Sequence, residues 1–252
     1  MEFRKVYDLI PEEFDKWRPR YCEEAFDHII QYADLKPGKR VLEIGPGTGQ
    51  ATLPLLQTEC DYVGIELGSH LFEYTKNKFA DYGNLTMIND DFCTHNFANE
   101  QFDMVFSAAT IQWIPEEIAF SRAFELLKPG GCLVMIANLG NEEHRNSAGL
   151  LAEKNTIYEK YFKPETHYNC RINKGNVINY GFLPIEVADY EYDTDMSADD
   201  FVSLTMTHAD HITLQEPNRS LFMNGLRDAI NQYGGIWKCH DRVNIVKVRK
   251  PE

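Results

Sequence analysis

The chain has 252 residues, of which 43% are hydrophobic, enough to bury a core and to argue against disorder. Its 25 Lys and Arg residues are outnumbered by 39 Asp and Glu residues, giving a net charge of -14. A surface of that sign repels phosphate backbones and anionic lipid, so neither nucleic acid nor a membrane is expected as a partner.

The six cysteines are scattered singly, without a C-x-x-C pair, and are expected to be reduced thiols. The longest uncharged apolar stretch, residues 131–140, is too short to span a bilayer, and the charged N-terminus does not resemble a targeting segment. These features predict a cytoplasmic protein. They leave its oligomeric state open.

Residues 40–137 predict a parallel sheet with crossover helices. A helix over residues 22–35 stops at Lys-Pro-Gly and leads into the first strand. Short apolar runs then predict strands over residues 40–45, 61–67, 85–90, 102–108 and 132–137. The segments between them predict helices over residues 50–58, 69–83 and 116–131, the last ending in a Lys-Pro-Gly-Gly stop signal.

After residue 140 the pattern changes. Residues 141–180 are polar, rich in aromatic residues and only weakly periodic. A strand over residues 185–194, helices over 197–209 and 217–235, and a final strand over 241–250 follow. We expect one domain with four parts, namely a lid and helix (1–35), a cofactor-binding core (36–140), a cap that selects the substrate (141–235) and a last strand (236–252).

Three alternate glycines, Gly45, Gly47 and Gly49, follow the first predicted strand. Such a turn lets backbone approach a ligand closely, at a helix N-terminus that favours anionic groups. The dinucleotide fingerprint would place its third glycine where this chain has Gln50, and no Lys-Ser or Lys-Thr completes a P-loop. Glu43 would repel a pyrophosphate. A cationic, phosphate-free nucleoside such as S-adenosylmethionine suits this site better.

Acidic residues also follow the next two predicted strands. Glu66 ends the second strand, where a carboxylate can accept from both hydroxyls of a ribose. Asp90, Asp91 and Phe92 follow the third strand and suit an adenine, with one aspartate at the ligand and the other capping a turn. Acids at three successive strand ends predict one nucleoside-binding site.

With these motifs in place, the sequence resembles the class I S-adenosylmethionine-dependent methyltransferases, in particular their small-molecule group. The resemblance covers roughly residues 20–140. It implies a Rossmann-like α/β fold with a seven-stranded, mostly parallel sheet, an antiparallel last strand and helices on both faces. The matching segments are "VLEIGPGTGQATLPL", "VGIEL", "NDDF", "FDMVFSAATIQWIP" and "LLKPGGCLVMI", together with a lid-like "FDKWRPRY".

The resemblance also implies roles for individual residues toward S-adenosyl-L-methionine and its product, S-adenosyl-L-homocysteine. Glu43 and the three glycines would hold the methionine end, Glu66 the ribose, and Asp91 with Phe92 the polar edge of the adenine. The remaining candidates are Leu67 on the adenine face, Ser107 and Ala108 beside the sulfonium, and Arg18 and Tyr21 near the cofactor carboxylate.

The acceptor-side residues are less well defined. Gln112 and Trp113 would lie near a small-molecule acceptor, but related enzymes often have His-Trp there, and glutamine is no general base. The catalytic residue therefore stays unassigned. The spacing of His208 and His211 could bind a metal, although ordinary polar contacts are the preferred interpretation, so no metal site is predicted.

Other interpretations remain open. Packing or a substrate pocket are equal alternatives for the aromatic residues Tyr158, Tyr161, Phe162 and Tyr168. A protein acceptor is compatible with the sequence. So are a cofactor-binding sensor or partner subunit without transferase activity and, less favoured, a nicotinamide-dependent oxidoreductase on a similar sheet.

Overall fold

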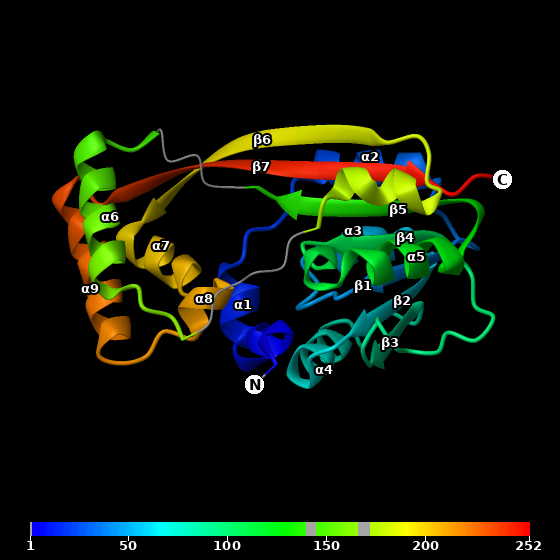
Figure 1. Ribbon diagram of the computed structural model, residues 1–252, viewed down its shortest axis with the longest axis horizontal. Helices are drawn as coiled ribbons and strands as arrows, with labels where there is room; N and C mark the ends of the chain where they lie inside the picture. The colour runs from blue at the N-terminus through cyan, green and yellow to red at the C-terminus, as the bar shows by residue number, and fades with distance from the viewer. Residues whose placement is uncertain (1, 140–144, 166–171) are drawn as a thin grey trace. The chain divides into compact units, whose positions relative to one another are not determined.

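The computed structural model describes residues 2–139, 145–165 and 172–252 (Figure 1). The chain divides into two compact units. Unit 1 consists of Met1–Arg18, Leu139–Asn169 and Glu191–Arg242, and unit 2 of Pro19–Asn138, Cys170–Tyr190 and Val243–Glu252.

Unit 2 contains the first five strands of the sheet and the helices that connect them. In chain order its elements are α2 (Glu23–Ala33), β1 (Arg40–Ile44), α3 (Thr52–Leu56), β2 (Asp61–Glu66), α4 (Ser69–Lys78), β3 (Leu85–Asn89), β4 (Phe102–Ala108), η2 (Ile111–Trp113), α5 (Glu116–Leu126), β5 (Leu127–Asn138) and η4 (Lys174–Tyr180).

Unit 1 is mainly helical. Its elements are η1 (Phe3–Leu9), α1 (Pro11–Trp17), α6 (Ala148–Tyr161), α7 (Ala198–Thr205), α8 (Ala209–Ile212) and α9 (Asn218–Gln232). Two long strands, β6 (Glu186–Ser197) and β7 (Ile236–Arg249), contribute residues to both units.

The sheet has seven strands in the order β3-β2-β1-β4-β5-β7-β6. Strands β1 to β5 pair in parallel, and β7 runs antiparallel to β5 with Val134 opposite Lys247. Strands β2 and β3 are added on one side of β1, and β4 and β5 on the other, so the strand order reverses at β1. In such sheets, ligands bind at the carboxyl ends of the strands next to this point. The predicted fold class is confirmed.

Alternation along the strands directs successive side chains to opposite faces of the sheet. On one face, Leu42 and Ile44 join the hydrophobic cluster that includes Phe120 of α5. The intervening Glu43 points to the other face, where it is fully buried. A carboxyl group thus lies within an apolar layer directly before the glycine-rich loop.

Unit 1 has its own core, formed by residues of α6, α7, α9 and the start of β7. Trp237 is fully buried there and stacks on Phe201, with ring centroids 4.2 Å apart. The predicted aromatic residues Tyr158, Tyr161 and Phe162 pack against this core, whereas Tyr168 lies outside the described residues. Packing is therefore the observed role of these three rings.

Three local features differ from the sequence predictions. Residues 148–161, interpreted as weakly periodic, form helix α6, whose N-cap Ser147 accepts a hydrogen bond from the Leu150 amide. The Lys-Pro-Gly-Gly segment belongs to β5, because α5 ends at Leu126. Strand β7 begins at Ile236, five residues earlier than expected.

Candidate functional site

The loop between β1 and α3 requires glycine. Gly45, Gly47 and Gly49 have φ of 65°, 62° and 80°, a region that other L-residues rarely adopt. Space is also limiting, because a Cβ on Gly45 would lie 2.4 Å from Cγ2 of Thr110, and one on Gly49 would lie 2.3 Å from Cε2 of Phe79. The glycines thus allow the loop to turn tightly against its neighbours.

Side chains outside the loop bind its carbonyl groups. Thr75 Oγ1 on α4 donates to the Gly47 carbonyl at 2.5 Å, and Lys78 Nζ donates to the Thr48 carbonyl at 3.0 Å. After β4, Thr110 Oγ1 donates to the Gly45 carbonyl at 3.0 Å. These bonds fix the path of the loop at the carboxyl edge of the sheet.

Glu66 is almost fully buried at the end of β2, and each of its carboxylate oxygens accepts a backbone hydrogen bond. Gly47 N donates to Oε2 at 2.9 Å, and Gly68 N donates to Oε1 at 3.0 Å. These amides orient the carboxylate beside the glycine loop.

Glu43 lies beneath the same loop. Its Oε2 accepts hydrogen bonds from Thr52 Oγ1 at 2.6 Å and from the Tyr62 hydroxyl at 3.0 Å. Its Oε1 is buried and has no hydrogen-bond partner in the part of the chain that the structure describes. Burial raises the pKa of Glu43 to about 7, against the lowering effect of the two hydroxyl donors. Its direct contact with a cofactor stays a prediction.

The acidic residues after β3 form turns. Asp90 Oδ1 accepts from the Asp91 amide and Oδ2 lies 2.8 Å from His95 Nδ1, while Asp91 Oδ1 accepts from the Cys93 amide at 2.9 Å. The Phe92 ring packs in the hydrophobic core against Phe97. The backbone of Phe92, and not its ring, is therefore the part suited to contact the edge of an adenine.

The end of β4 carries the candidates for the sulfonium and the acceptor. Ser107 is fully buried, and its Oγ has no hydrogen-bond partner among the described residues. Ala108 is half-buried and precedes a turn that leads into η2. In η2, Gln112 Nε2 donates to the Ala109 carbonyl at 2.8 Å, and Trp113 is half-buried. Gln112 is thus held as a hydrogen-bonding amide and offers no basic group.

The two predicted lid residues fall in different units. Arg18 is the last residue of the first segment of unit 1, and Tyr21 belongs to unit 2, where its ring packs edge-on against Phe26 at 6.1 Å. Leu67 follows β2 directly and is half-buried. The remaining predicted cofactor residues all belong to unit 2, on the β1, β2, β3 and β4 ends or the segments that follow.

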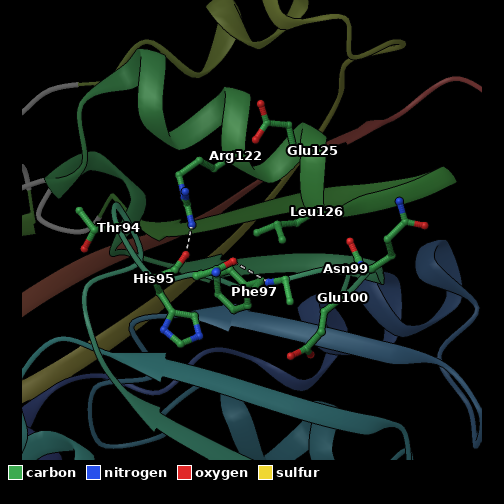
Figure 2. A pocket seen from close by; sticks show the side chains of 11 residues that line it. Thr94, His95, Phe97, Asn99, Glu100, Arg122, Glu125 and Leu126 are labelled. Carbon is green, nitrogen blue, oxygen red and sulfur yellow. Dashed lines mark hydrogen bonds between the residues drawn. The ribbon is translucent and has the colours of Figure 1, made fainter.

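A separate cavity of about 490 Å³ lies between the β3–β4 connection and α5 (Figure 2). Its walls include His95, Phe97 and Arg122, and Arg122 Nη2 donates to the His95 carbonyl at 2.5 Å. The cavity contains none of the predicted cofactor residues. The Asp90–His95 pair connects it to the turn after β3, a relation that sequence spacing alone did not indicate.

Two possibilities raised by the sequence can be examined within the described residues. No group of three or more His, Cys, Asp or Glu side chains there could hold a metal ion, and His208 and His211 make protein contacts instead. None of the helices in the described ranges combines the length and apolar character that a bilayer span requires.

The segment that contains the glycine loop and the strand-end acids matches a known protein family. Residues 41–131 match a family model described as a methyltransferase domain. These residues form a methyltransferase domain, and the fold is that of the class I S-adenosylmethionine-dependent methyltransferases. The matched segment begins in β1 and ends in β5, so this methyltransferase domain includes the loop, Glu66, Asp91, Ser107 and η2.

Relatives and solved structures extend this comparison. The chain is 29% identical over 137 residues to an uncharacterized methyltransferase of Anoxybacillus flavithermus, covering 48% of this chain and 63% of that one. It is 37% identical over 82 residues to a mitochondrial ribosomal RNA small subunit methyltransferase of Arabidopsis thaliana, covering 31% and 21%. The first curated relatives it matches are covered over 5% to 63% of their own length.

Among solved structures, the fold is similar to a phosphoethanolamine N-methyltransferase of Haemonchus contortus, in complex with phosphomonomethylethanolamine and S-adenosylhomocysteine. The TM-score is 0.59 and the identity 17%, with 100% of this chain and 61% of that chain covered. At this identity the likeness concerns the fold. The relatives' names include both RNA and small-molecule enzymes, so they do not define the acceptor.

The residues of the methyltransferase domain fit S-adenosylmethionine. A carboxylate at the position of Glu66 is of the kind that accepts hydrogen bonds from ribose hydroxyls. Two buried polar atoms, Ser107 Oγ and Glu43 Oε1, lack partners next to the loop. An unpartnered acceptor and a small hydroxyl match a ligand that carries an ammonium and a sulfonium.

Proposed function

We propose that the protein transfers the methyl group of S-adenosylmethionine to a small-molecule acceptor by in-line displacement. The observation that carries this proposal is the buried Glu66 carboxylate, which Gly47 N and Gly68 N orient beside the glycine loop at the end of β2. The acidic net charge supports a small molecule over a nucleic acid. A cytoplasmic setting belongs to the same proposal.

When bound, S-adenosylmethionine supplies a methyl group that its sulfonium makes electrophilic. The chain's own residues bind and orient. Glu66 holds the ribose, Asp91 and the Phe92 backbone hold the adenine edge, and the loop amides receive the cofactor carboxylate. Ser107 and Ala108 border the sulfur. Alignment and exclusion of water then account for most of the rate enhancement, because the leaving group is already activated.

Gln112 and Trp113 contribute to acceptor positioning in this proposal. Because Gln112 takes no proton at neutral pH, the acceptor must arrive deprotonated or be deprotonated elsewhere. The bond from Gln112 Nε2 to the Ala109 carbonyl fixes the amide on the loop that follows β4. This arrangement supports a positioning function for η2.

The test is calorimetric titration of the Glu66→Gln variant with S-adenosylhomocysteine. Replacing one carboxylate oxygen by an amide removes an acceptor and places an NH₂ group against a backbone amide donor. We expect affinity to fall by about 1 to 3 kcal/mol, which is at least about fivefold in Kd. Glu73→Gln, an exposed change on α4, is the matched control and should bind like the wild type.

Unchanged affinity in Glu66→Gln would remove this residue from the site. Binding of NADH in place of S-adenosylhomocysteine would instead favour the oxidoreductase alternative. A further incubation with labelled S-adenosylmethionine and a pooled metabolite extract separates an enzyme from a sensor. A sensor would bind the cofactor without forming any labelled product.

A further inference from the structure

The turn that follows β3 is held by hydrogen bonds that lead from the Asp91 amide through Asp90 to His95. Asp90 Oδ1 accepts from the Asp91 amide at 2.8 Å, and Asp90 Oδ2 lies 2.8 Å from His95 Nδ1. Hydrogen bonds from His95 and from the Asp91 amide lower the pKa of Asp90, so its carboxylate is ionised at neutral pH. Because an ionised carboxylate can only accept, Nδ1 of His95 carries the hydrogen in this arrangement. The imidazole therefore donates to the carboxylate that holds the Asp91 amide.

The backbone of His95 is fixed independently of its ring. Its amide donates to the Asp91 carbonyl at 2.8 Å, and its carbonyl accepts from Arg122 Nη2 on α5. The Arg122 guanidinium also lies over the Phe92 ring, with Cζ 5.4 Å from the ring centroid. In Figure 2 the carbonyl of His95 faces Arg122, whereas its ring points away from α5. Replacement of the His95 side chain thus removes the bond to Asp90 and leaves the backbone bonds of the turn in place.

The stability of the fold does not account for the pair formed by Asp90 and His95. The Asp90 side chain is 50% exposed and that of His95 is 22% exposed. Polar pairs with this much access to water contribute little to the free energy of unfolding, because water competes for the same groups. Asp90, however, immediately precedes Asp91 and Phe92, the two residues assigned to the adenine edge. A small change in the direction of the Asp91 amide would move both of them.

We propose that His95 is a positioning residue for the adenine of the cofactor. It acts through Asp90, whose carboxylate orients the Asp91 amide, so no contact between the imidazole and the cofactor is required. The pair thereby holds the Asp91 carboxylate and the Phe92 backbone in the arrangement that an amino-substituted purine requires. This inference rests on the proposed function, which assigns the adenine edge to Asp91 and Phe92.

The consequence is selectivity for a purine that carries an exocyclic amino group. Adenine presents an N–H donor and a ring nitrogen acceptor, which a carboxylate and a backbone amide match. Hypoxanthine, the deaminated base, presents a carbonyl oxygen and a ring N–H at the same two positions, so both contacts become unfavourable. A site built to hydrogen-bond a group rejects the wrong group strongly when its own polar groups are held in place. Loss of His95 should therefore reduce this selectivity.

The experiment is calorimetric titration of the full chain with S-adenosylhomocysteine and with S-inosylhomocysteine, its deaminated analogue. The wild type should bind the adenine ligand at least about tenfold more tightly. His95→Leu has a branched side chain without a donor. It should bind S-adenosylhomocysteine at least about fivefold more weakly and S-inosylhomocysteine within about twofold of the wild type, which also shows that it is folded.

Three results of these titrations would overturn the inference. Equal losses for both ligands in His95→Leu would indicate general damage to the site. Unchanged affinity for S-adenosylhomocysteine in this variant would show that His95 positions nothing. Equal affinity of the wild type for the two ligands would show that the amino group is not recognised.

Two further variants test the hydrogen bond itself. His95→Asn should retain most of the selectivity, because Nδ2 of asparagine can take the position of Nδ1 and donate to Asp90. A loss equal to that in His95→Leu would contradict the assignment of the donor. His240→Leu is the matched control, since His240 Nδ1 lies 2.8 Å from Asp193 Oδ1 and its side chain is also 22% exposed. It should leave both affinities unchanged, and a loss of selectivity there would overturn the inference.

Asp90→Ala tests the route by which His95 acts. Because His95 acts through Asp90, Asp90→Ala alone should lower selectivity as much as Asp90→Ala combined with His95→Leu. Additive losses would show that His95 acts by another route and would overturn the inference. Failure of the wild type to bind S-adenosylhomocysteine would contradict the proposed function and this inference with it. Binding by the wild type without any loss in His95→Leu would contradict this inference alone.

Discussion

At the scale of single residues, Glu43 and Glu66 show how the surrounding hydrogen-bond donors make two glutamate side chains differ. Glu66 accepts from two backbone amides, which stabilise its charged form. Glu43 has two hydroxyl donors on one oxygen and none on the other, in a fully buried setting. The sequence predicted both acids at the site because each lies at the end of an apolar strand. It could not predict the hydroxyl partners of Glu43, which depend on packing between β1, β2 and α3.

Glu43 should make stability depend on pH. Its pKa is raised from 4.5 to about 7 in the folded chain, so the folded state holds this proton more tightly than the unfolded state. The stabilisation is complete below pH 4.5 and is lost as pH rises through 7, by about 3 kcal/mol. Urea denaturation at pH 5 and pH 8 measures it. Glu43→Gln should lose less stability than the wild type over this interval, and an equal loss in both proteins would contradict the assignment.

At the scale of elements, the strands before the site were predicted closely. The apolar runs at residues 40–45, 61–67, 85–90 and 102–108 correspond to β1 to β4 within one residue at each end. Parallel strands covered by helices are apolar on both faces, which makes such runs easy to recognise. The strand-end acids of the candidate site follow directly from these boundaries.

Helix α6 was not predicted from the sequence, and the reason is physical. Leu150 and Ile157, two turns apart, are its only fully buried residues, so the apolar stripe is too narrow to give a clear period. The N-cap Ser147 was the available signal. The contact between Tyr158 and His211 was equally inaccessible, because residues distant in sequence meet only through tertiary packing.

The glycine loop offers a stability test at the element scale. At Gly38, φ is 90° and nothing lies within 4 Å of an added Cβ, so Gly38→Ala measures backbone strain alone, about 1 to 2 kcal/mol. Gly49→Ala adds a collision with the buried Phe79 ring and should cost a further 1 to 3 kcal/mol, roughly. Denaturant unfolding of both variants measures the difference. Equal losses would show that the ring moves aside without cost.

At the scale of the whole molecule, the family match and all the candidate cofactor residues except Arg18 lie in unit 2, whereas the helices of unit 1 lie outside the matched segment. The sequence alone indicated that the pattern of apolar and polar residues changes near residue 140. It did not place residues 2–18 with the later helices, because that association requires contacts across nearly the whole chain, such as the one between Arg18 and Thr207.

This division predicts where a ligand protects the backbone. Binding of S-adenosylhomocysteine at 100 times its Kd adds about 2.7 kcal/mol to the stability of the structure that it contacts. Hydrogen exchange measured by mass spectrometry should slow in peptides from β1, the glycine loop and the end of β2. Peptides from α6 and α9 serve as the internal control and should change little. Equal protection in both sets would contradict a cofactor site confined to unit 2.

Thr110 links the glycine loop, where the methyl donor is proposed to bind, to the segment proposed to position the acceptor. Its hydroxyl binds the Gly45 carbonyl, its methyl group occupies the space that a Cβ on Gly45 would need, and two residues later the chain reaches Gln112. Any displacement of the first glycine on arrival of the donor therefore has a short covalent route to the amide assigned to the acceptor. We therefore expect donor binding to shift Gln112 through Thr110, so that the donor binds before the acceptor.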